Sequence, residues 1–291
     1  MTQTLLTAWK AAQARLKEAR IDSPAIDARL LLEASVGVSR MDILTDPYRA
    51  LTADEAAAYD AVIERRLRRE PVSRIIGKKG FWKILLNVTP DVLSPRPDTE
   101  ALLDVILPAF PEGRPFQMID LGTGSGAILL AVLAERAAAT GVGTDISFEA
   151  LAVARDNAAG LGLDNRATFL RTEWAAGFGD HSFDVVASNP PYIPTGDIPG
   201  LDPEVRDHDP HLALDGGADG LEAYRQLAPE IVRILKPGGV LAVEIGWDQG
   251  PAVKALFEAA GLTDVKVVKD LGDRDRVVTN GPDPRAAPVS L

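Results

Sequence analysis

The chain contains no cysteine and only three histidines, which excludes several kinds of chemistry at the outset. Without thiols there are no disulfides, no thiolate nucleophile and no zinc centre with cysteine ligands. The longest purely apolar run, residues 127–134, is far shorter than the ~20 residues that a membrane span needs. The first residues also lack the basic start, apolar middle and cleavage site of a signal peptide. We therefore expect a cytoplasmic protein with no membrane partner and no metal site.

Acidic side chains outnumber basic ones, but not evenly along the chain. Residues 1–85 hold 15 basic and 11 acidic side chains, whereas the remaining 206 residues hold 16 and 31, a formal net charge of −15. Nucleic-acid affinity comes largely from basic side chains that neutralise phosphates, so the acidic part argues against stable nucleic-acid binding. Improved solubility is the alternative explanation for this excess.

Helical signals dominate residues 1–73. Ser23 followed by Pro24 indicates one helix start, and a capping box at 52–55 opens another helix. The second helix ends in a basic run, 65–69, which we interpret as a solvated helix end rather than a contact with an acidic partner. Residues 74–93 then suggest a β-hairpin that links two domains.

From residue 94 to 281 strand and helix patterns alternate, which predicts an α/β domain with a mostly parallel sheet covered on both faces. The last strand follows a connection too short for a crossover helix, so it should be antiparallel. The tail, 282–291, is rich in proline and alanine and is expected to be disordered. Seven strands are predicted at 116–120, 142–145, 167–170, 183–188, 240–244, 265–269 and 276–279, and helices near 126–138, 147–160, 220–235 and 249–260.

A glycine-rich turn, Asp120-Leu121-Gly122-Thr123-Gly124-Ser125-Gly126-Ala127, follows the first of these strands. Glycine lets the backbone turn sharply and approach a ligand closely. Asp145, at the end of the next predicted strand, can accept hydrogen bonds from ribose hydroxyls. The turn also satisfies a dinucleotide fingerprint, so it predicts a nucleoside cofactor without choosing NAD over S-adenosylmethionine. Asp120 favours the latter, because its carboxylate can meet an α-amino group but would repel a pyrophosphate.

The strand at 183–188 ends directly in Asn189-Pro190-Pro191-Tyr192. From average composition this tetrapeptide should arise by chance in roughly one chain of this size per thousand. A planar NH₂ group could be held here by the Asn189 side-chain carbonyl and the Pro190 backbone carbonyl, while the Tyr192 ring stacks on it. Because prolines fix φ, Pro190 and Pro191 would hold these acceptors in place. The pattern predicts methyl transfer to an amide or amine nitrogen, against the alternative of a rigid turn.

A long polar stretch, 193–220, comes after the tetrapeptide and could form a lid or a wall of the substrate site. It contains His208 and His211 together with Asp207 and Asp209. We interpret these four as solvated loop residues rather than as a metal site, since the proposed chemistry needs no metal.

Taken together, the motifs resemble those of the release-factor glutamine N5-methyltransferases, the HemK/PrmC family. The pair formed by the 94–100 motif and the 189–192 tetrapeptide is specific to that family, whereas many methyltransferases share the glycine turn. The resemblance rests on Phe81-Trp82, Ser94-Pro95-Arg96-Pro97-Asp98-Thr99-Glu100, Asp120–Gly126, Asn189–Tyr192, Glu204-Val205-Arg206, Leu214-Asp215-Gly216-Gly217, Asp219-Gly220-Leu221, Lys236-Pro237-Gly238-Gly239, Glu244-Ile245-Gly246 and Asp273–Val277.

The resemblance implies a class I, Rossmann-like methyltransferase fold and methylation of the glutamine side chain in the Gly-Gly-Gln motif of class 1 release factors. Residues 1–73 would help to recognise that protein partner. Asn189, Pro190 and Tyr192 would be catalytic, and with Pro191 would bind the substrate. S-adenosylmethionine, and its product S-adenosylhomocysteine, would be bound by Asp120, Leu121, Gly122, Thr123, Gly124, Asp145, Trp174 and Asn189.

In two places the chain departs from the family pattern. Glu173 precedes Trp174, where the family usually has aspartate, and Ser94 stands where an aliphatic residue is common. Arg96 and Glu100 would shape the pocket or support its structure.

Three other functions compete with this one. An N6-adenine nucleic-acid methyltransferase would use the same tetrapeptide, but it must also flip a base and hold DNA or RNA. A nucleotide-dependent dehydrogenase would use the glycine turn and leave residues 189–192 unexplained. A binding module without catalysis would show no turnover with any acceptor.

Overall fold

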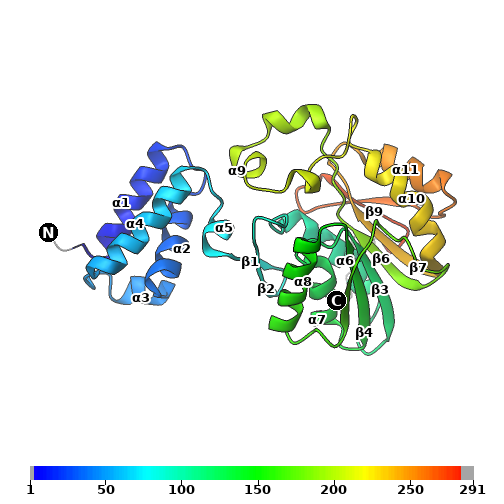
Figure 1. Ribbon diagram of the computed structural model, residues 1–291, viewed down its shortest axis with the longest axis horizontal. Helices are drawn as coiled ribbons and strands as arrows, with labels where there is room; N and C mark the ends of the chain where they lie inside the picture. Colours follow the sequence, from blue (N-terminus) through cyan, green and yellow to red (C-terminus); the bar gives the residue numbers. More distant parts are fainter. Residues whose placement is uncertain (1–2, 283–291) are drawn as a thin grey trace, which may run out of the picture. The chain divides into compact units, whose positions relative to one another are not determined.

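The computed structural model describes residues 3–282, so the expected disorder of the tail falls almost entirely outside the described residues. The chain forms two compact units (Figure 1). The first comprises residues 1–78 together with 202–208, and the second comprises residues 79–201 and 209–291.

Helices make up the first unit. Three of its longer helices pack around a core that includes Leu5, Leu16, Leu31 and Ile63, while the buried Tyr59 hydroxyl donates a hydrogen bond to a backbone carbonyl of a neighbouring helix. The predicted capping box opens α4 through Thr52. The helices are α1 (Leu5–Glu18), α2 (Pro24–Val36), α3 (Arg40–Thr45), α4 (Ala53–Leu67), α5 (Val72–Ile76) and α9 (Pro203–Arg206).

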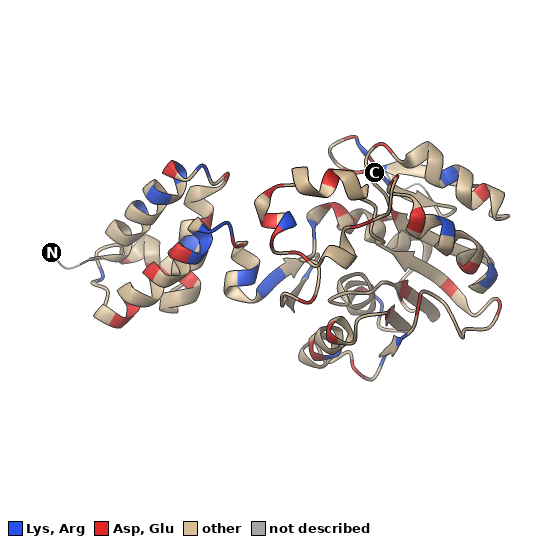
Figure 2. Cartoon of the chain, turned by 45° about the horizontal axis from the view of Figure 1, so that its top comes forward, with Lys and Arg blue, Asp and Glu red and all other residues tan. Residues whose placement is uncertain are grey.

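The basic run at the end of α4 is only in part the solvated helix end that its composition suggested (Lys and Arg are blue in Figure 2): Arg68 is exposed, but Arg66 is buried. The Arg66 side chain is 8% exposed, and it donates to Asp27 Oδ2 at 2.8 Å and to Glu204 Oε1 at 3.1 Å. Arg69 also contacts Glu204, at 3.3 Å. The run therefore ties α4 to α2 and to α9, a segment more than 130 residues later in the chain.

The hairpin begins later than predicted. Residues 75 and 76 complete α5, because an apolar pair can continue a helix as well as a strand, and Gly77 ends that helix in the left-handed conformation. β1 (Lys78–Phe81) and β2 (Ile84–Asn87) then pair as a two-stranded sheet. Trp82 occupies the turn with a φ of 52°.

A seven-stranded sheet forms the centre of the second unit, in the order β5-β4-β3-β6-β7-β9-β8. β9 runs antiparallel to both of its neighbours, as its short connection predicted, and the other pairs are parallel. The expected class I methyltransferase architecture is thereby confirmed. The strands are β3 (Phe116–Leu121), β4 (Ala139–Asp145), β5 (Ala167–Arg171), β6 (Phe183–Ser188), β7 (Leu235–Glu244), β8 (Lys266–Lys269) and β9 (Asp275–Thr279).

Alternate residues of the central strands enter two separate cores. Met118 and Val185 face one core with α6, α7 and α8, whereas Ile119 and Val186 face the other with α10 and α11. This is the double burial that makes parallel strands apolar on both faces. The helices are α6 (Ala101–Ala109), α7 (Ala127–Glu135), α8 (Phe148–Gly160), α10 (Glu222–Ile234) and α11 (Gly250–Ala259). Short 3-10 turns lie at Pro97–Glu100, Thr195–Gly200 and His211–Ala213.

Two strands begin three or more residues before their predicted starts, whereas the other strand boundaries agree within one residue. β4 begins at Ala139 rather than at 142, and β7 begins at Leu235 rather than at 240. In both cases the early part of the strand contains residues with weak β-propensity, such as Gly141 and Gly239, and pairing with the neighbouring strand decides the conformation. Added Cβ atoms at Gly141 would lie 2.4 Å from the Leu129 side chain.

Replacing Arg66 with methionine should strongly destabilise the helical unit. The change removes a buried cation and leaves the carboxylates of Asp27 and Glu204 without their shared partner, which costs about 3–5 kcal/mol in comparable buried pairs. Urea unfolding followed by far-UV circular dichroism measures this loss.

Arg15→Met is the matched control, because Arg15 pairs with Asp60 and Glu64 at the surface, where such pairs contribute below about 1 kcal/mol. Equal losses in the two variants would contradict the structural role given to Arg66.

Candidate active site

The two motifs singled out in the sequence meet at the centre of the sheet. β3 and β6 are parallel neighbours, although the chain passes through β4 and β5 between them. Leu121 pairs with Ser188, so the glycine turn and residues 189–192 leave the sheet at the same level. Ligands bind at such a switch point in open α/β sheets. A cavity of about 300 Å³ lies there.

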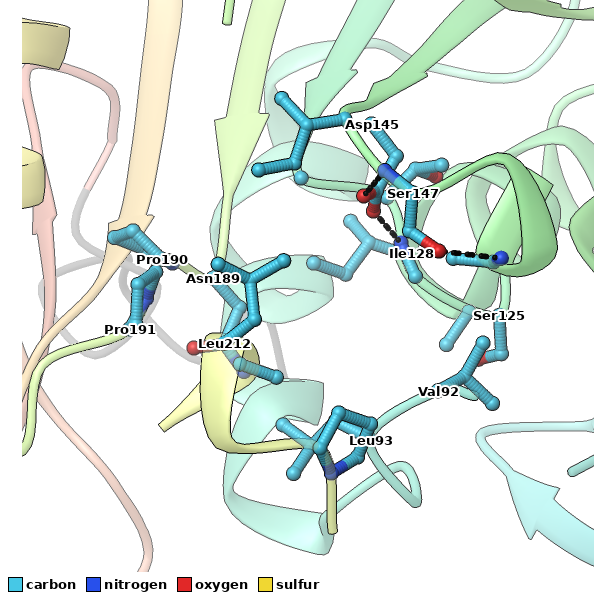
Figure 3. A pocket seen from close by; sticks show the side chains of 18 of the residues that line it. Val92, Leu93, Ser125, Ile128, Asp145, Ser147, Asn189, Pro190, Pro191 and Leu212 are labelled. Carbon is cyan, nitrogen blue, oxygen red and sulfur yellow. Dashed lines mark hydrogen bonds between the residues drawn. The ribbon is translucent and has the colours of Figure 1, made fainter. Parts of the chain in front are cut away.

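The cavity is lined from both sides (Figure 3). Asn189, Pro190 and Pro191 lie on one side, and Asp145 and Ser147 lie across from them. Apolar side chains and the glycine turn form much of the remaining wall. Among the predicted site residues, the cavity is lined by Gly122, Thr123, Gly124, Asp145, Trp174, Asn189, Pro190 and Pro191, while Asp120, Leu121 and Tyr192 lie behind this lining.

The glycine turn needs backbone conformations that other residues rarely adopt. Gly122, Gly124 and Gly126 have φ values of 70°, 54° and 81°. The Trp174 ring covers the turn: a Cβ added at Gly122 would lie 3.5 Å from it. The indole nitrogen of Trp174 donates to Gln226 Oε1 at 2.8 Å, which fixes the ring at the cavity wall.

Asp145 orders the turn from the neighbouring strand. Its Oδ2 accepts the backbone N–H of Gly124 at 3.0 Å, and its Oδ1 accepts that of Ser147 at 2.9 Å. Each carboxylate oxygen keeps a further lone pair for a ligand hydroxyl. Asp145 can therefore hold the turn and a ribose together.

Asp120 is fully buried at the end of β3. Its Oδ2 accepts the Thr123 hydroxyl at 2.6 Å, but Oδ1 has no hydrogen-bond partner among residues 3–282. Burial raises the pKa of Asp120 to about 7, and the Thr123 hydrogen bond opposes this rise. A buried carboxyl group with a free oxygen is suited to a cationic group of a ligand.

Asn189 presents one end of its side-chain amide to the protein. Nδ2 donates to the buried Thr99 Oγ1 at 3.2 Å, which leaves the amide carbonyl as the group available to the cavity. Tyr192 points elsewhere: its hydroxyl lies 3.4 Å from Glu244 Oε1, and burial raises its pKa. Stacking of the Tyr192 ring on a substrate stays a prediction.

Three polar side chains that hold this site together could not be recognised as site residues from the sequence. The Gln249 amide donates to the carbonyls of Tyr192 and Gly220 and accepts the N–H of Gly246. Gly220 must be glycine, since its φ is 73° and an added Cβ would lie 2.4 Å from the Tyr192 carbonyl oxygen. Gln249 thus holds both ends of the 193–220 segment by hydrogen bonds to their backbone carbonyls.

Asp209 is the second of these. We expected it to be a solvated loop residue, but its side chain is fully buried and accepts from Arg96 at 2.5 Å and from the backbone of Ser94 at 3.4 Å. Because Arg96 and Pro210 both line the cavity, this contact makes part of the 193–220 segment a wall of the site.

The third is Asn157 on α8. Its side chain exchanges two hydrogen bonds with the backbone of Asn87 in the hairpin and donates a third to the carbonyl of Ser125 in the glycine turn. Each partner is far away in the sequence, so no local motif could have revealed it.

These features fit S-adenosylmethionine as a cofactor. Apolar side chains such as Ile128 and Ile146 can enclose the adenine beside Trp174, and Asp145 suits the ribose. The unpartnered oxygen of Asp120 suits an α-ammonium group.

Comparisons with known proteins give an independent view. The family model described as the PrmC N-terminal domain matches residues 7–77, and a methyltransferase-domain model matches residues 114–271. Among solved structures, a methyltransferase from Pyrococcus furiosus is 20% identical, with a TM-score of 0.48 over 68% of this chain and 89% of that one.

Relatives of much higher identity carry a specific name. A release factor glutamine methyltransferase from Caulobacter vibrioides is 62% identical and covers 99% of this chain and 100% of its own length. Those of Rhodospirillum rubrum and Agrobacterium fabrum are 50% and 46% identical, over 90% and 92% of this chain and 80% and 94% of their own lengths. With both parts of the chain matched over almost its entire length, the protein belongs to the release factor glutamine methyltransferase family.

Proposed function

We propose that this methyltransferase moves the methyl group of S-adenosylmethionine to the side-chain amide nitrogen of the glutamine in the Gly-Gly-Gln motif of class 1 release factors. One observation carries the proposal: the acceptors for a planar NH₂ group at Asn189 and Pro190 line the same cavity as Asp145 and Trp174, which suit the cofactor. The relatives' names support the choice of substrate. Because release factors act in translation, we place the reaction in the cytoplasm.

The cofactor supplies an electrophilic methyl group on a sulfonium centre. Asp120, Asp145 and Trp174 would hold its ammonium, ribose and adenine groups, with the glycine turn at Gly122 and Gly124 approaching it closely. The protein's main contribution is then to position the acceptor nitrogen in line with the methyl carbon.

The acceptor side of the reaction depends on residues 189–192. The amide nitrogen of glutamine is a poor nucleophile, because its lone pair is delocalised into the carbonyl group. Asn189 Oδ1 and the Pro190 carbonyl would each accept one of its N–H groups, so that its face points at the methyl carbon. As the N–C bond forms and the C–S bond breaks, these acceptors stabilise the positive charge that develops on N–H. The nitrogen would then release one proton to solvent, and the cofactor would leave as the neutral thioether S-adenosylhomocysteine.

We assign partner recognition to residues 1–73, linkage to residues 74–93 and methyl transfer to residues 94–281. An N6-adenine substrate fits the tetrapeptide equally well, but the net charge of −15 over residues 86–291 disfavours a phosphate backbone. Within residues 3–282, no helix combines the length and hydropathy that a membrane span requires.

Labelled S-adenosylmethionine tests the proposal directly. The protein is incubated with a class 1 release factor, with the same factor carrying Gln→Ala in its Gly-Gly-Gln motif, or with duplex DNA. We expect label on the unmodified factor alone. Label on DNA, or equal label on the Ala variant, would refute the assignment.

Asn189→Ala should lower kcat at least a hundredfold, because removing a preorganised acceptor costs about that much in comparable sites. Affinity for S-adenosylhomocysteine, measured by calorimetry, should change much less. Asn165→Ala is the control, since Asn165 is an exposed residue in the turn after α8. Intact turnover in Asn189→Ala would remove this residue from the mechanism.

The raised pKa of Asp120 predicts a pH-dependent cofactor affinity. Without a ligand, Asp120 is more stable protonated in the folded protein than in the unfolded chain. Its contribution to the free energy of unfolding is fully present below the pKa of the unfolded chain, and it is lost as pH rises through about 7. A cation at Oδ1 favours the ionised carboxyl group, so binding of S-adenosylhomocysteine should tighten by up to about tenfold per pH unit as pH approaches 7.

Calorimetry between pH 6 and pH 8 measures this dependence. It should vanish in Asp120→Asn, and it should be absent for 5′-methylthioadenosine, which lacks the ammonium group. An unchanged pH dependence in Asp120→Asn would show that another group is responsible.

A further inference from the structure

The segment that carries Trp174, residues 172–178, forms neither helix nor strand. Trp174 itself has a φ of 43°, in the left-handed region that a bulky residue rarely adopts. Such a backbone conformation persists only where the surrounding structure holds it. The segment therefore depends on groups from other parts of the second unit.

Three polar side chains on one face of α10 supply these groups. Gln226, Glu230 and Arg233 are spaced four and three residues apart, so they lie in a row along the helix. The opposite face of α10 packs into the second core of the sheet through residues such as Leu227 and Ile231. The apolar face thus fixes the helix, and the row of polar side chains is presented to the segment 172–178.

Two of the three side chains bind the backbone that follows Trp174. Glu230 Oε2 accepts the N–H of the buried Ala175 at 2.7 Å. Arg233 donates to the carbonyl of Phe178 at 2.6 Å and to that of Ala175 at 3.3 Å. Hydrogen bonds to charged groups are stronger than those between neutral groups, so they hold the backbone firmly. They do not set the orientation of the Trp174 ring.

Gln226 contacts the ring itself, and both residues line the cavity. Trp174 Nε1 donates to Gln226 Oε1 at 2.8 Å. Because an indole N–H can only donate, the Gln226 amide must turn its oxygen to the ring. Its NH₂ end lies 3.3 Å from Glu222 Oε1, which agrees with this orientation. The far edge of the indole, at Cζ3, lies over the glycine turn, 3.5 Å from a Cβ added at Gly122.

We propose that Gln226 is a positioning residue for the cofactor: it holds the Trp174 ring in the orientation that packs on the adenine. The proposal rests on the proposed function, in which Trp174 holds that adenine. A side chain that is ordered before binding loses less conformational entropy when the ligand arrives, so affinity rises. The ribose separates the adenine from the sulfonium centre, so Gln226 acts on cofactor binding and leaves the methyl-transfer step unchanged.

The test compares the full-length protein with Gln226→Met, Gln226→Glu and Arg225→Gln. Methionine has a similar length but no oxygen acceptor, whereas glutamate keeps one. Arg225 is the matched control, because it is an exposed residue of the same helix and pairs with Asp219.

Calorimetry measures the Kd for S-adenosylhomocysteine. Gln226→Met should raise it about threefold to tenfold, the effect of losing one neutral hydrogen bond. The other two variants should stay within twofold of the parent. With a class 1 release factor as substrate, Gln226→Met should raise the KM for S-adenosylmethionine, while kcat at saturating S-adenosylmethionine stays within twofold.

Two further measurements separate positioning of the ring from a general loosening of the site. 5′-Methylthioadenosine shares the adenosine group, so Gln226→Met should weaken it by the same factor as S-adenosylhomocysteine. The chain has four tryptophans, and in protein labelled with ¹⁵N the indole signal of Trp174 is the one lost in Trp174→Phe. In Gln226→Met the proton shift of this signal should move upfield, because its hydrogen bond is lost, whereas Gln226→Glu should retain it.

The double variant Trp174→Phe/Gln226→Met tests whether Gln226 acts through the indole. Phenylalanine has no N–H to donate, so the second change should alter the Kd of Trp174→Phe by less than twofold. An unchanged Kd in Gln226→Met would overturn the positioning role, and so would independent losses in the double variant. If the unsubstituted protein binds no S-adenosylhomocysteine, the proposed function itself fails, so the two failures are distinguishable.

Discussion

The site depends on the parallel pairing of β3 with β6. These two strands are separated in the sequence by two βα units, and their pairing brings two loops together at one edge of the sheet. One loop carries the glycines and the other carries Asn189. A one-residue change of register would turn the side chains of a strand to the opposite face, so the two cores that flank β3 and β6 also fix the site.

Around this pairing, each loop is held by side chains from other elements. Asp145 and Asn157 bind the glycine turn from β4 and α8, and Gln249 and Thr99 bind the second loop. Each contact is a buried or half-buried hydrogen bond, where losing a partner is costly. The cavity is thereby largely preformed, as a reaction that depends on positioning requires.

The sequence predicts those features that depend on local chemistry. The capping box of α4, the glycine turn and the seven strands all leave patterns within a few residues of each other, and the structure has each of them. Arg66 and Asp209 were misjudged, because their partners lie 39 to 138 residues away and composition alone suggests that charges are solvated. Glu244 was seen only as part of a motif, since nothing local shows that it is buried with its carboxyl group beside the Tyr192 hydroxyl.

The chain passes between the two units more than once, and this limits how the protein can be cut into separate domains. Because residues 202–208 belong to the helical unit, the backbone crosses between the units at three places rather than one. A single proteolytic cut between residues 78 and 79 would therefore divide the helical unit itself, since residues 202–208 would stay on the fragment that carries the second unit. A fragment that stops at residue 78 would also lack Glu204, one of the two carboxylates that neutralise Arg66. The helical unit is thus discontinuous in sequence, and the family model that matches residues 7–77 spans only its larger piece.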